Sequence, residues 1–328
     1  MNTYGNLFKI SVYGESHSKY MGVIIDGMKC GIRINGEEIS SLLKRRNPSK
    51  NYETARKEDD VFTIKSGLLN NYTTGSPICV EIENTAYDST KYSFFSDVPR
   101  PGHIDFVVKK KYGGYADLNG SGMWSGRLSA LLVIGGYFAS KMIPFITTSE
   151  IVNVGGEIDS EKFDSVMENS KKEQDSVGGV IKINTSNMIV GLGEPLFNKL
   201  TSNIASLLFS VGGVKGVNFG EFYNDVSIKG SSYNDPFINK EGKTRSNNSG
   251  GINAGISSGN DLVIYCLVRP ISSISKIQNT YSLKEDKMVD LKIEGRHDSS
   301  ILNRIKVVLE SCVSISLANA YLEYLAYK

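Results

Sequence analysis

The feature that most limits the possible folds is an apolar run at residues 130–146, which follows a stretch rich in glycine. Apolar residues in this part of the chain have the spacing of an α-helix. They are Leu128, Leu131, Leu132, Ile134, Phe138 and Met142. Gly135-Gly136 and Lys141 interrupt the run, which makes it too short to span a bilayer. We therefore predict a helix buried in a folded core and entered from a flexible loop.

Other apolar patterns predict both strands and helices. We expect strands at residues 8–12, 23–25, 180–183, 214–219 and 262–268, and helices at 196–209 and 301–325. Asn35, with Glu38 three residues later, predicts a capped helix that ends at the basic residues 44–46. The mixture indicates an α+β or α/β protein. No linker or shift in composition divides residues 1–328, so we predict a single domain.

Composition and charge exclude several classes of function. A net charge of +2 argues against a protein that binds nucleic acid or a membrane surface. The four cysteines form no CxxC pair and lie mostly in apolar runs, so we expect reduced core residues and no metal site. The first residues show no basic start leading into an apolar stretch, which favours a cytoplasmic protein.

All three histidines of the chain close short segments of polar residues. The segments are Gly14-Glu15-Ser16-His17, Pro99-Arg100-Pro101-Gly102-His103 and Gly295-Arg296-His297-Asp298. Imidazole has an ordinary pKa of about 6.5 and exchanges protons near neutral pH. The pattern predicts acid–base chemistry at His17, His103 and Asp298. At any one segment, a turn histidine whose ring bonds to the backbone remains the alternative.

Arginines accompany these segments and predict an anionic ligand. They are Arg45, Arg46, Arg56, Arg100, Arg127, Arg296 and Arg304. Guanidinium groups bind phosphate and carboxylate through paired hydrogen bonds. For Arg45 and Arg46 the alternative is that cations suit a helix C-terminus, worth a few tenths of a kcal/mol each. The glycine-rich segment 113–126 leads into a helix N-terminus, whose free N–H groups also favour an anion.

Three further segments resemble known functional patterns or segment types. Gly120, Gly122 and Gly126 imitate a dinucleotide fingerprint, but no apolar strand precedes them. Residues 255–259 match GxSxG but precede a strand instead of a helix, which argues against a serine hydrolase. The long Ser-, Asn- and Gly-rich segment 231–260 is typical of a functional lid or of disorder.

Read together, these segments resemble the chorismate synthase family, in that family's order, over nearly the whole chain. Residues 14–17 resemble its GESH motif, 43–48 its RRxP motif and 99–105 its PRPGHAD motif. Residues 54–60, 175–179, 191–195, 247–259 and 295–298 match later or intervening segments of the family pattern. The glycine loop departs from that pattern, because Met123 and Leu128 stand where the family has arginine and glutamate.

The resemblance implies an α+β fold, a single-domain β-α-β sandwich with long functional loops, assembled as a homotetramer. It implies a lyase of aromatic amino acid biosynthesis that eliminates phosphate from 5-enolpyruvylshikimate 3-phosphate to give chorismate. The implied cofactor is reduced FMN, with NADPH as a candidate reductant. Two alternatives stay open, a flavin reductase that uses NADPH and a non-catalytic relative that binds flavin and polyanions.

Carried over position by position, the resemblance gives acid–base roles to His17, His103 and Asp298 and leaves His297 structural. The implied substrate-binding residues are Ser16, Arg45, Arg46, Arg100, Arg127 and Arg296, and Arg46 would also contact NADP if it binds. The implied FMN contacts are Met123, Trp124, Ser125, Gly212, Gly213, Ala254, Arg269, Pro270, Ile271, Ser272, Ser273 and Arg296.

Overall fold

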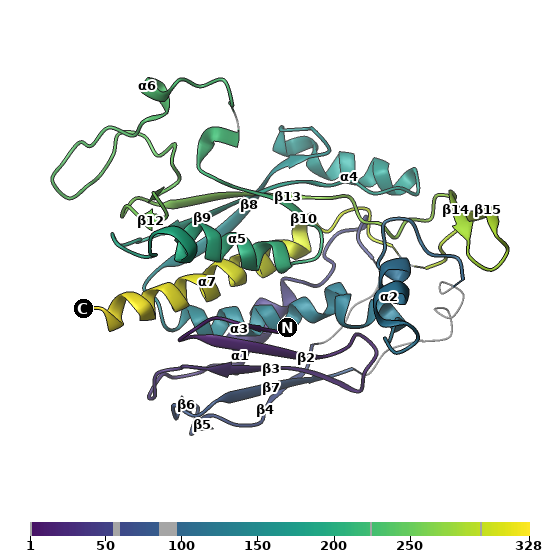
Figure 1. Ribbon diagram of the computed structural model, residues 1–328, viewed down its shortest axis with the longest axis horizontal. Helices are drawn as coiled ribbons and strands as arrows, with labels where there is room; N and C mark the ends of the chain where they lie inside the picture. Colours follow the sequence, from purple (N-terminus) through teal and green to yellow (C-terminus); the bar gives the residue numbers. More distant parts are fainter. Residues whose placement is uncertain (1, 55–59, 85–96, 224, 296) are drawn as a thin grey trace.

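Two antiparallel sheets form the outer layers of a sandwich, and helices lie between them (Figure 1). The computed structural model describes residues 2–54, 60–84, 97–223, 225–295 and 297–328. The first sheet has the order β1 (Thr3–Tyr4), β2 (Lys9–Gly14), β3 (Tyr20–Asp26), β7 (Ile78–Glu83) and β4 (Phe62–Ile64). The second has the order β10 (Val214–Phe219), β13 (Leu262–Val268), β9 (Gly179–Ser186) and β8 (Ile146–Val154). The fold is therefore α+β, and the predicted sandwich is confirmed.

Two buried helices, α3 (Ser129–Ser140) and α7 (Leu302–Ala326), pack against each other between the sheets. Side chains of α7 are buried on every side from residue 307 to 320, which is the pattern of a helix surrounded by protein. By length and composition α7 is apolar enough to cross a membrane, but 83% of its most apolar window is buried inside the molecule. One hydrophobic cluster runs through both helices and the inner faces of both sheets.

The remaining described helices either pack against α3 or α7 or lie toward the ends and outer face of the sandwich. They are α1 (Gly36–Lys44), α2 (Asp105–Tyr112), α4 (Phe163–Lys172), α5 (Leu200–Ser210) and α6 (Gly230–Tyr233), with 3-10 turns at Asn119–Trp124, Gly126–Leu128, Ser160–Lys162, Leu196–Asn198 and Glu221–Tyr223. The short paired strands are β5 (Leu68–Leu69) with β6 (Tyr72–Thr73), β11 (Ile252–Asn253) with β12 (Ile256–Ser257), and β14 (Gln278–Ser282) with β15 (Lys287–Leu291).

Helix α1 begins where its cap predicts, but only half of the capping box forms. The Asn35 side chain accepts a hydrogen bond of 2.9 Å from the backbone N–H of Glu37. Glu38 does not return the bond, because its carboxylate pairs with Lys141 at 2.6 Å. This ion pair joins α1 to the end of α3, so tertiary packing replaces the local contact.

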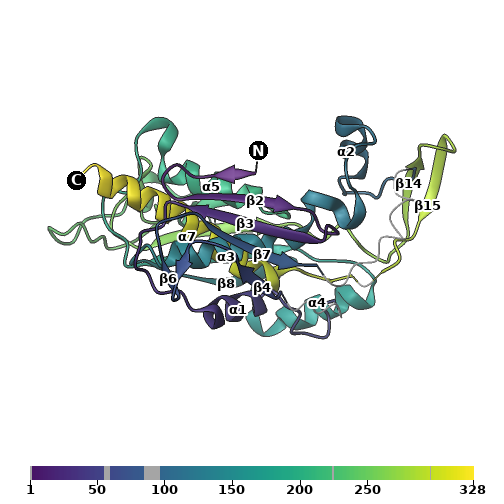
Figure 2. The same cartoon turned by 90° about the horizontal axis from the view of Figure 1, so that it is seen from below.

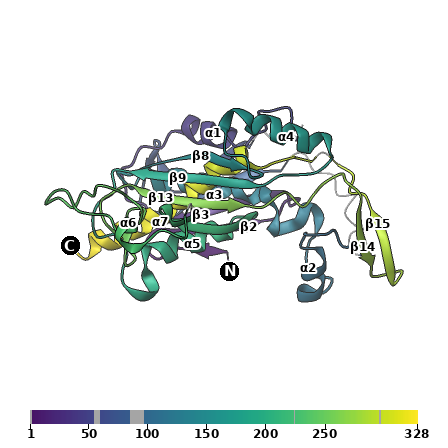
Figure 3. The same ribbon diagram turned by 90° about the horizontal axis from the view of Figure 1, so that it is seen from above.

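Hairpin β14–β15 and helix α2 extend from one end of the sandwich, as Figures 2 and 3 show. Segment 231–260, by contrast, lies at the other end, beyond β12 in Figure 1. The Asp235 carboxylate accepts hydrogen bonds from the Ser246 hydroxyl and from the backbone N–H groups of Asn248 and Ser249, at 2.8–2.9 Å. These bonds give the middle of that segment a defined conformation.

Candidate active site

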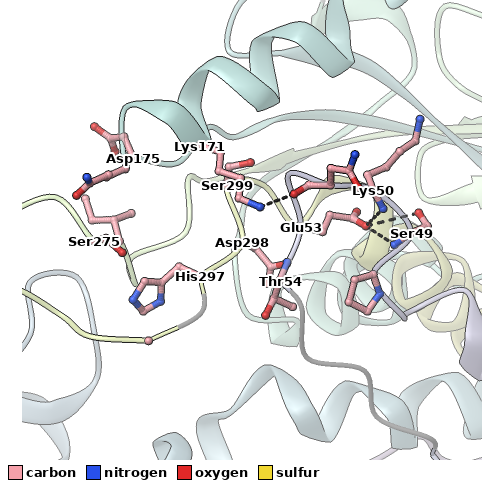
Figure 4. A pocket seen from close by; sticks show the side chains of 15 residues that line it. Ser49, Lys50, Glu53, Thr54, Lys171, Asp175, Ser275, His297, Asp298 and Ser299 are labelled. Atoms are coloured by element: carbon pink, nitrogen blue, oxygen red, sulfur yellow. Dashed lines mark hydrogen bonds between the residues drawn. The ribbon is translucent and has the colours of Figure 1, made fainter.

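Two adjoining cavities open at the end of the sandwich where α1, α3 and α7 meet the loops between elements. The central cavity has a volume of about 410 Å³. Its polar lining is Ser16, Arg46, Asn47, Thr54, Asp60, Ser125, Arg127, Ser129, Ser273, His297, Asp298 and Arg304, and the glycines that line it are Gly120, Gly126 and Gly212. The side cavity, about 530 Å³, shares Thr54, His297 and Asp298 with it (Figure 4). Both volumes are within the range of small-molecule sites.

One wall of the central cavity is an arginine pair held by a single carboxylate. Asp60 accepts a hydrogen bond from Arg46 Nη1 at 2.8 Å through Oδ2 and another from Arg127 Nη1 through Oδ1. The three side chains are only 3–9% exposed. Arg46 follows α1, Arg127 lies in the 3-10 turn before α3, and Asp60 precedes β4. Three elements distant in sequence therefore fix this wall.

Asp298 forms part of both cavities, and both of its oxygens are engaged. Oδ1 accepts the backbone N–H of Thr54 at 2.8 Å, and Oδ2 accepts Arg304 Nη1 at 2.7 Å. Arg304 also donates from Nε to the backbone carbonyl of Arg46 at 2.7 Å. The carboxylate consequently has a fixed orientation and is tied to the segment that carries the arginine pair.

The two nitrogens of the His297 ring bond within the protein. Nδ1 lies 3.0 Å from the Ser273 hydroxyl, and Nε2 lies 3.1 Å from the backbone carbonyl of Ile293. These contacts orient the ring between Ser273 and the loop before α7. The predicted structural role of His297 is consistent with them and stays a prediction.

His17 lies immediately behind the cavity wall, next to Gly120. His17 is 8% exposed and Ser16 5% exposed, and Ser16 itself lines the central cavity. Gly120 has a φ of +58°, and a Cβ at this position would lie 2.6 Å from His17 Nε2 and 2.7 Å from Ser16 Oγ. Only glycine combines this backbone conformation with such a close approach. The glycine-rich loop therefore packs directly on the first histidine segment.

His103 lies in a turn outside the linings of both cavities. Burial lowers the pKa of its imidazole, and the neighbouring Arg100 guanidinium lowers it further. Arg100 is engaged by Asp105 in two side-chain hydrogen bonds of 2.8 and 2.7 Å. The turn reaches the cavity lining indirectly, because the carbonyl of Gly102 accepts a 2.9 Å hydrogen bond from the hydroxyl of Ser272.

The other predicted substrate-binding residues are placed differently. Arg45 lines neither cavity, is 44% exposed and pairs with Glu310 of α7 at 2.7 Å, where Ser149 of β8 also donates to the glutamate at 2.6 Å. Arg296 lies outside the described residues. The structure thus brings Ser16, Arg46 and Arg127 together around the central cavity, but neither Arg45 nor Arg100 lines it.

The predicted FMN contacts divide into three groups. Ser125, Gly212, Ile271 and Ser273 line the central cavity. Met123, Trp124, Gly213, Arg269, Pro270 and Ser272 lie next to these residues in the chain but are not part of its lining. The Trp124 ring packs against Tyr112 of α2 with centroids 5.6 Å apart.

Among the predicted FMN contacts that the structure describes, Ala254 alone lies far from the others in this chain. It occupies the β11–β12 turn, which bonds to the start of α5 through Leu200 N–H and the carbonyl of Gly255, at 2.8 Å. Gly212 follows the end of α5. The 11 residues of this helix rise about 16 Å, so Ala254 and Gly212 are at its opposite ends.

Thr54, Asp60 and Arg304 belong to the site although the resemblance gives them no role. Arg304 is one of the arginines that predict an anionic ligand, and its position in the first turn of α7, six residues after Asp298, indicates that it lies near the site. Thr54 and Asp60 are the first and last residues of the segment 54–60 that matches the family pattern, but their roles depend on contacts with residues 46, 127 and 298. No local spacing reveals such contacts.

Comparison with known proteins gives one consistent result. The chorismate synthase family model matches residues 8–322. A chorismate synthase of Chitinophaga pinensis is 40% identical over 97% of this chain and 96% of its own length. One from Methanocaldococcus jannaschii is 36% identical with the same two shares. A crystal structure of chorismate synthase covers 98% of this chain and 94% of its own chain, with a TM-score of 0.75 at 23% identity.

Proposed function

Since the chain belongs to the chorismate synthase family, it is a lyase that forms chorismate, and we propose that the central cavity is where it does so. The observation that carries the proposal is the buried arginine pair on the cavity wall. 5-Enolpyruvylshikimate 3-phosphate bears a phosphate and two carboxylates, the groups that guanidinium binds best. Arg46 and Arg127 are the proposed anion contacts, with Arg304 behind them.

The residues around the cavity also fit a flat anionic cofactor such as reduced FMN. Gly126 and Gly212 border the central cavity, and a Cβ added at either would meet no atom within 4 Å. That leaves room for a ring system. The hydroxyl groups of Ser125 and Ser273 supply hydrogen-bond donors for polar edges or a phosphate. When bound, reduced FMN would supply electron density that assists phosphate loss and a nitrogen base for the ring proton.

We propose that this chain's own residues bind the anions and move protons. Asp298 accepts a proton at its carboxylate, which Thr54 and Arg304 hold in place. His17 holds a proton at Nε2, the atom nearest Gly120. His103 lies outside the cavity linings, so a proton transfer from it requires that the substrate reach the turn beside Ser272. Its lowered pKa makes the protonated form a stronger acid than ordinary imidazolium.

We further propose a homotetramer that works in the cytoplasm. Exposed apolar side chains on the projecting elements support assembly, among them Val107 of α2 at 54%, Ile277 at 62% and Met288 of β15 at 56% exposure. Isolated apolar residues are common on surfaces, whereas several on adjacent projections are typical of an interface. Light scattering of the purified protein tests this, and a monomer mass would contradict it.

An anaerobic assay tests the proposed activity and its cofactor. The protein is mixed with 5-enolpyruvylshikimate 3-phosphate and dithionite-reduced FMN, and chorismate is followed by absorbance. We expect turnover with reduced FMN and no turnover with oxidised FMN when no reductant is present. A full rate without any flavin would contradict the cofactor, and no product under any condition would contradict the activity. Adding NADPH with FMN in place of dithionite tests whether the protein reduces its own flavin.

A further inference from the structure

We propose that Asp60 is a positioning residue that sets the geometry of the anion-binding arginines, an inference that rests on the proposed function of the central cavity. The observation is that one carboxylate serves two guanidiniums, with a separate oxygen for each. Asp60 itself is 3% exposed. Its role is therefore to hold Arg46 and Arg127 side by side toward whatever occupies the cavity.

The backbone at Asp60 is anchored well enough for this role. Residue 62, two positions later, begins β4, which pairs with β7 at the edge of the first sheet. Phe62 packs against the main hydrophobic core. Asp60 also lines another cavity, which α1 residues such as Gly36 and Ser40 border. Asp60 therefore lies between this cavity and the central one. A carboxylate mounted on a sheet edge is a rigid reference point.

Charge explains why a carboxylate is required here. Two guanidiniums that approach one point repel each other, and little water is available to screen them when their side chains are 9% exposed. A negative charge between them offsets this repulsion and fixes both planes. With the carboxylate in place, both guanidiniums keep one arrangement before the substrate arrives, which lowers the ordering cost of binding.

An alternative role for the same contacts predicts the opposite result. If Asp60 acted as an internal anion that competes with substrate for the arginines, its removal would tighten binding. If it only stabilised the fold, its removal would lower the melting temperature and leave binding unchanged. The proposal can therefore be decided by the sign of the change in KM.

The first test compares Asp60→Asn with the wild type in the anaerobic assay. The amide keeps the shape of the side chain but removes its charge and places an N–H₂ group against a guanidinium. We expect KM for 5-enolpyruvylshikimate 3-phosphate to rise roughly 10- to 100-fold while kcat changes less than about threefold. A KM that is unchanged or lower overturns the proposal.

Glu310→Gln is the matched control. Glu310 is also a buried carboxylate bound to arginine, but it lines neither cavity. We expect this variant to melt at a lower temperature and to keep the wild-type KM. Asp60→Glu, which restores the charge with a longer side chain, should recover part of the lost affinity. If neither Asp60→Asn nor Asp60→Glu folds, Asp60 is a structural residue and the proposal is overturned.

Two further measurements separate positioning from other effects. Formate should lower the KM of Asp60→Ala, where it can occupy the vacated space, but not that of Asp60→Asn, where the amide fills it. The double variant Asp60→Asn with Arg127→Gln should raise KM by much less than the product of the two single-variant increases, because Asp60 acts partly through Arg127. Independent effects that multiply, together with no response to formate, would overturn the proposal.

Binding of inorganic phosphate, followed by calorimetry, makes the test independent of turnover. We expect the Kd for phosphate to rise about tenfold or more in Asp60→Asn and to stay unchanged in Glu310→Gln. If the wild type binds phosphate but forms no chorismate, the proposed activity fails while the role of Asp60 is still decided by this comparison. Equal phosphate affinity in wild type and Asp60→Asn would overturn it.

Discussion

Adjacent residues at the end of α1 belong to two arginine–carboxylate assemblies with different surroundings. Arg45 meets Glu310, which also accepts from Ser149, and this assembly joins α1, α7 and β8 while the Arg45 side chain stays 44% exposed. Arg46 meets Asp60, which is shared with Arg127, and this buried assembly borders the central cavity. The residue types are the same. What differs is whether the guanidinium lies at the surface or lines a cavity, and we infer that this separates stability from binding.

The largest effect is expected behind the cavity wall, at His17. If its imidazole transfers a proton, His17→Ala should reduce kcat by roughly 10²- to 10⁴-fold with little change in melting temperature. Rapid kinetics with reduced FMN and a thermal melt measure both quantities. Near-normal kcat would break the link between proximity to the cavity and catalysis, and would leave His17 as a packing residue against Gly120.

The next prediction sets Arg46→Ala against Arg45→Ala. Loss of Arg46 should weaken substrate binding by about 2 kcal/mol or more, because a desolvated charge contact is removed. Loss of Arg45 should instead lower the free energy of unfolding by about 1–3 kcal/mol, because the Glu310 carboxylate is left with fewer partners. Denaturant unfolding and KM are measured for both variants. A raised KM in Arg45→Ala, or an unchanged KM in Arg46→Ala, would contradict the assignment of stability to Arg45 and of substrate binding to Arg46.

The smallest effect concerns a third arginine–carboxylate pair, Arg100 with Asp105, and the histidine beside it. The folded pKa of His103 is lowered by burial and by Arg100, so the unfolded chain binds its proton first as the pH falls below about 6.5. Stability should therefore decrease on acidification from pH 7, until the folded pKa is passed. His103→Gln should remove this component, and its unfolding free energy should fall less between pH 7 and pH 5. An equal fall of the unfolding free energy in His103→Gln and in the wild type would contradict this role of His103.

Periodicity predicted the central elements of the fold well. Strands β10 and β13 were expected at the residues where they lie. Apolar side chains fill β13 without interruption, and β10 pairs with it although Lys215 and Asn218 interrupt its apolar residues. Helix α7 lies at Leu302–Ala326, within one residue of the predicted 301–325. Helix α3 begins where its apolar pattern begins, but it ends at Ser140, before the apolar run does, because Ile146 starts β8. Burial imposes a pattern on such elements, and the pattern can be read without knowing the neighbours.

The projecting elements could not be predicted in the same way. Strand β14 reads Gln-Asn-Thr-Tyr-Ser, and helix α2 carries exposed Phe106 and Val107 next to three lysines. Neither has a face that the core of this chain dictates. At the candidate site the sequence offered Arg45 and Arg46 equally, because each borders the same helix end, and only the fold separates their contacts.

The position of α7 bears on the order in which the protein can fold during synthesis. This helix follows every other described element in the chain, yet it occupies the middle of the sandwich. Both sheets and α3 therefore leave the ribosome before α7. The helix that fills the space between the two sheets is not yet available to pack there. Until then their apolar inner faces have no native partner and are exposed to association with other chains. We expect nascent chains that stop short of α7 to require chaperones and to be removed by proteolysis.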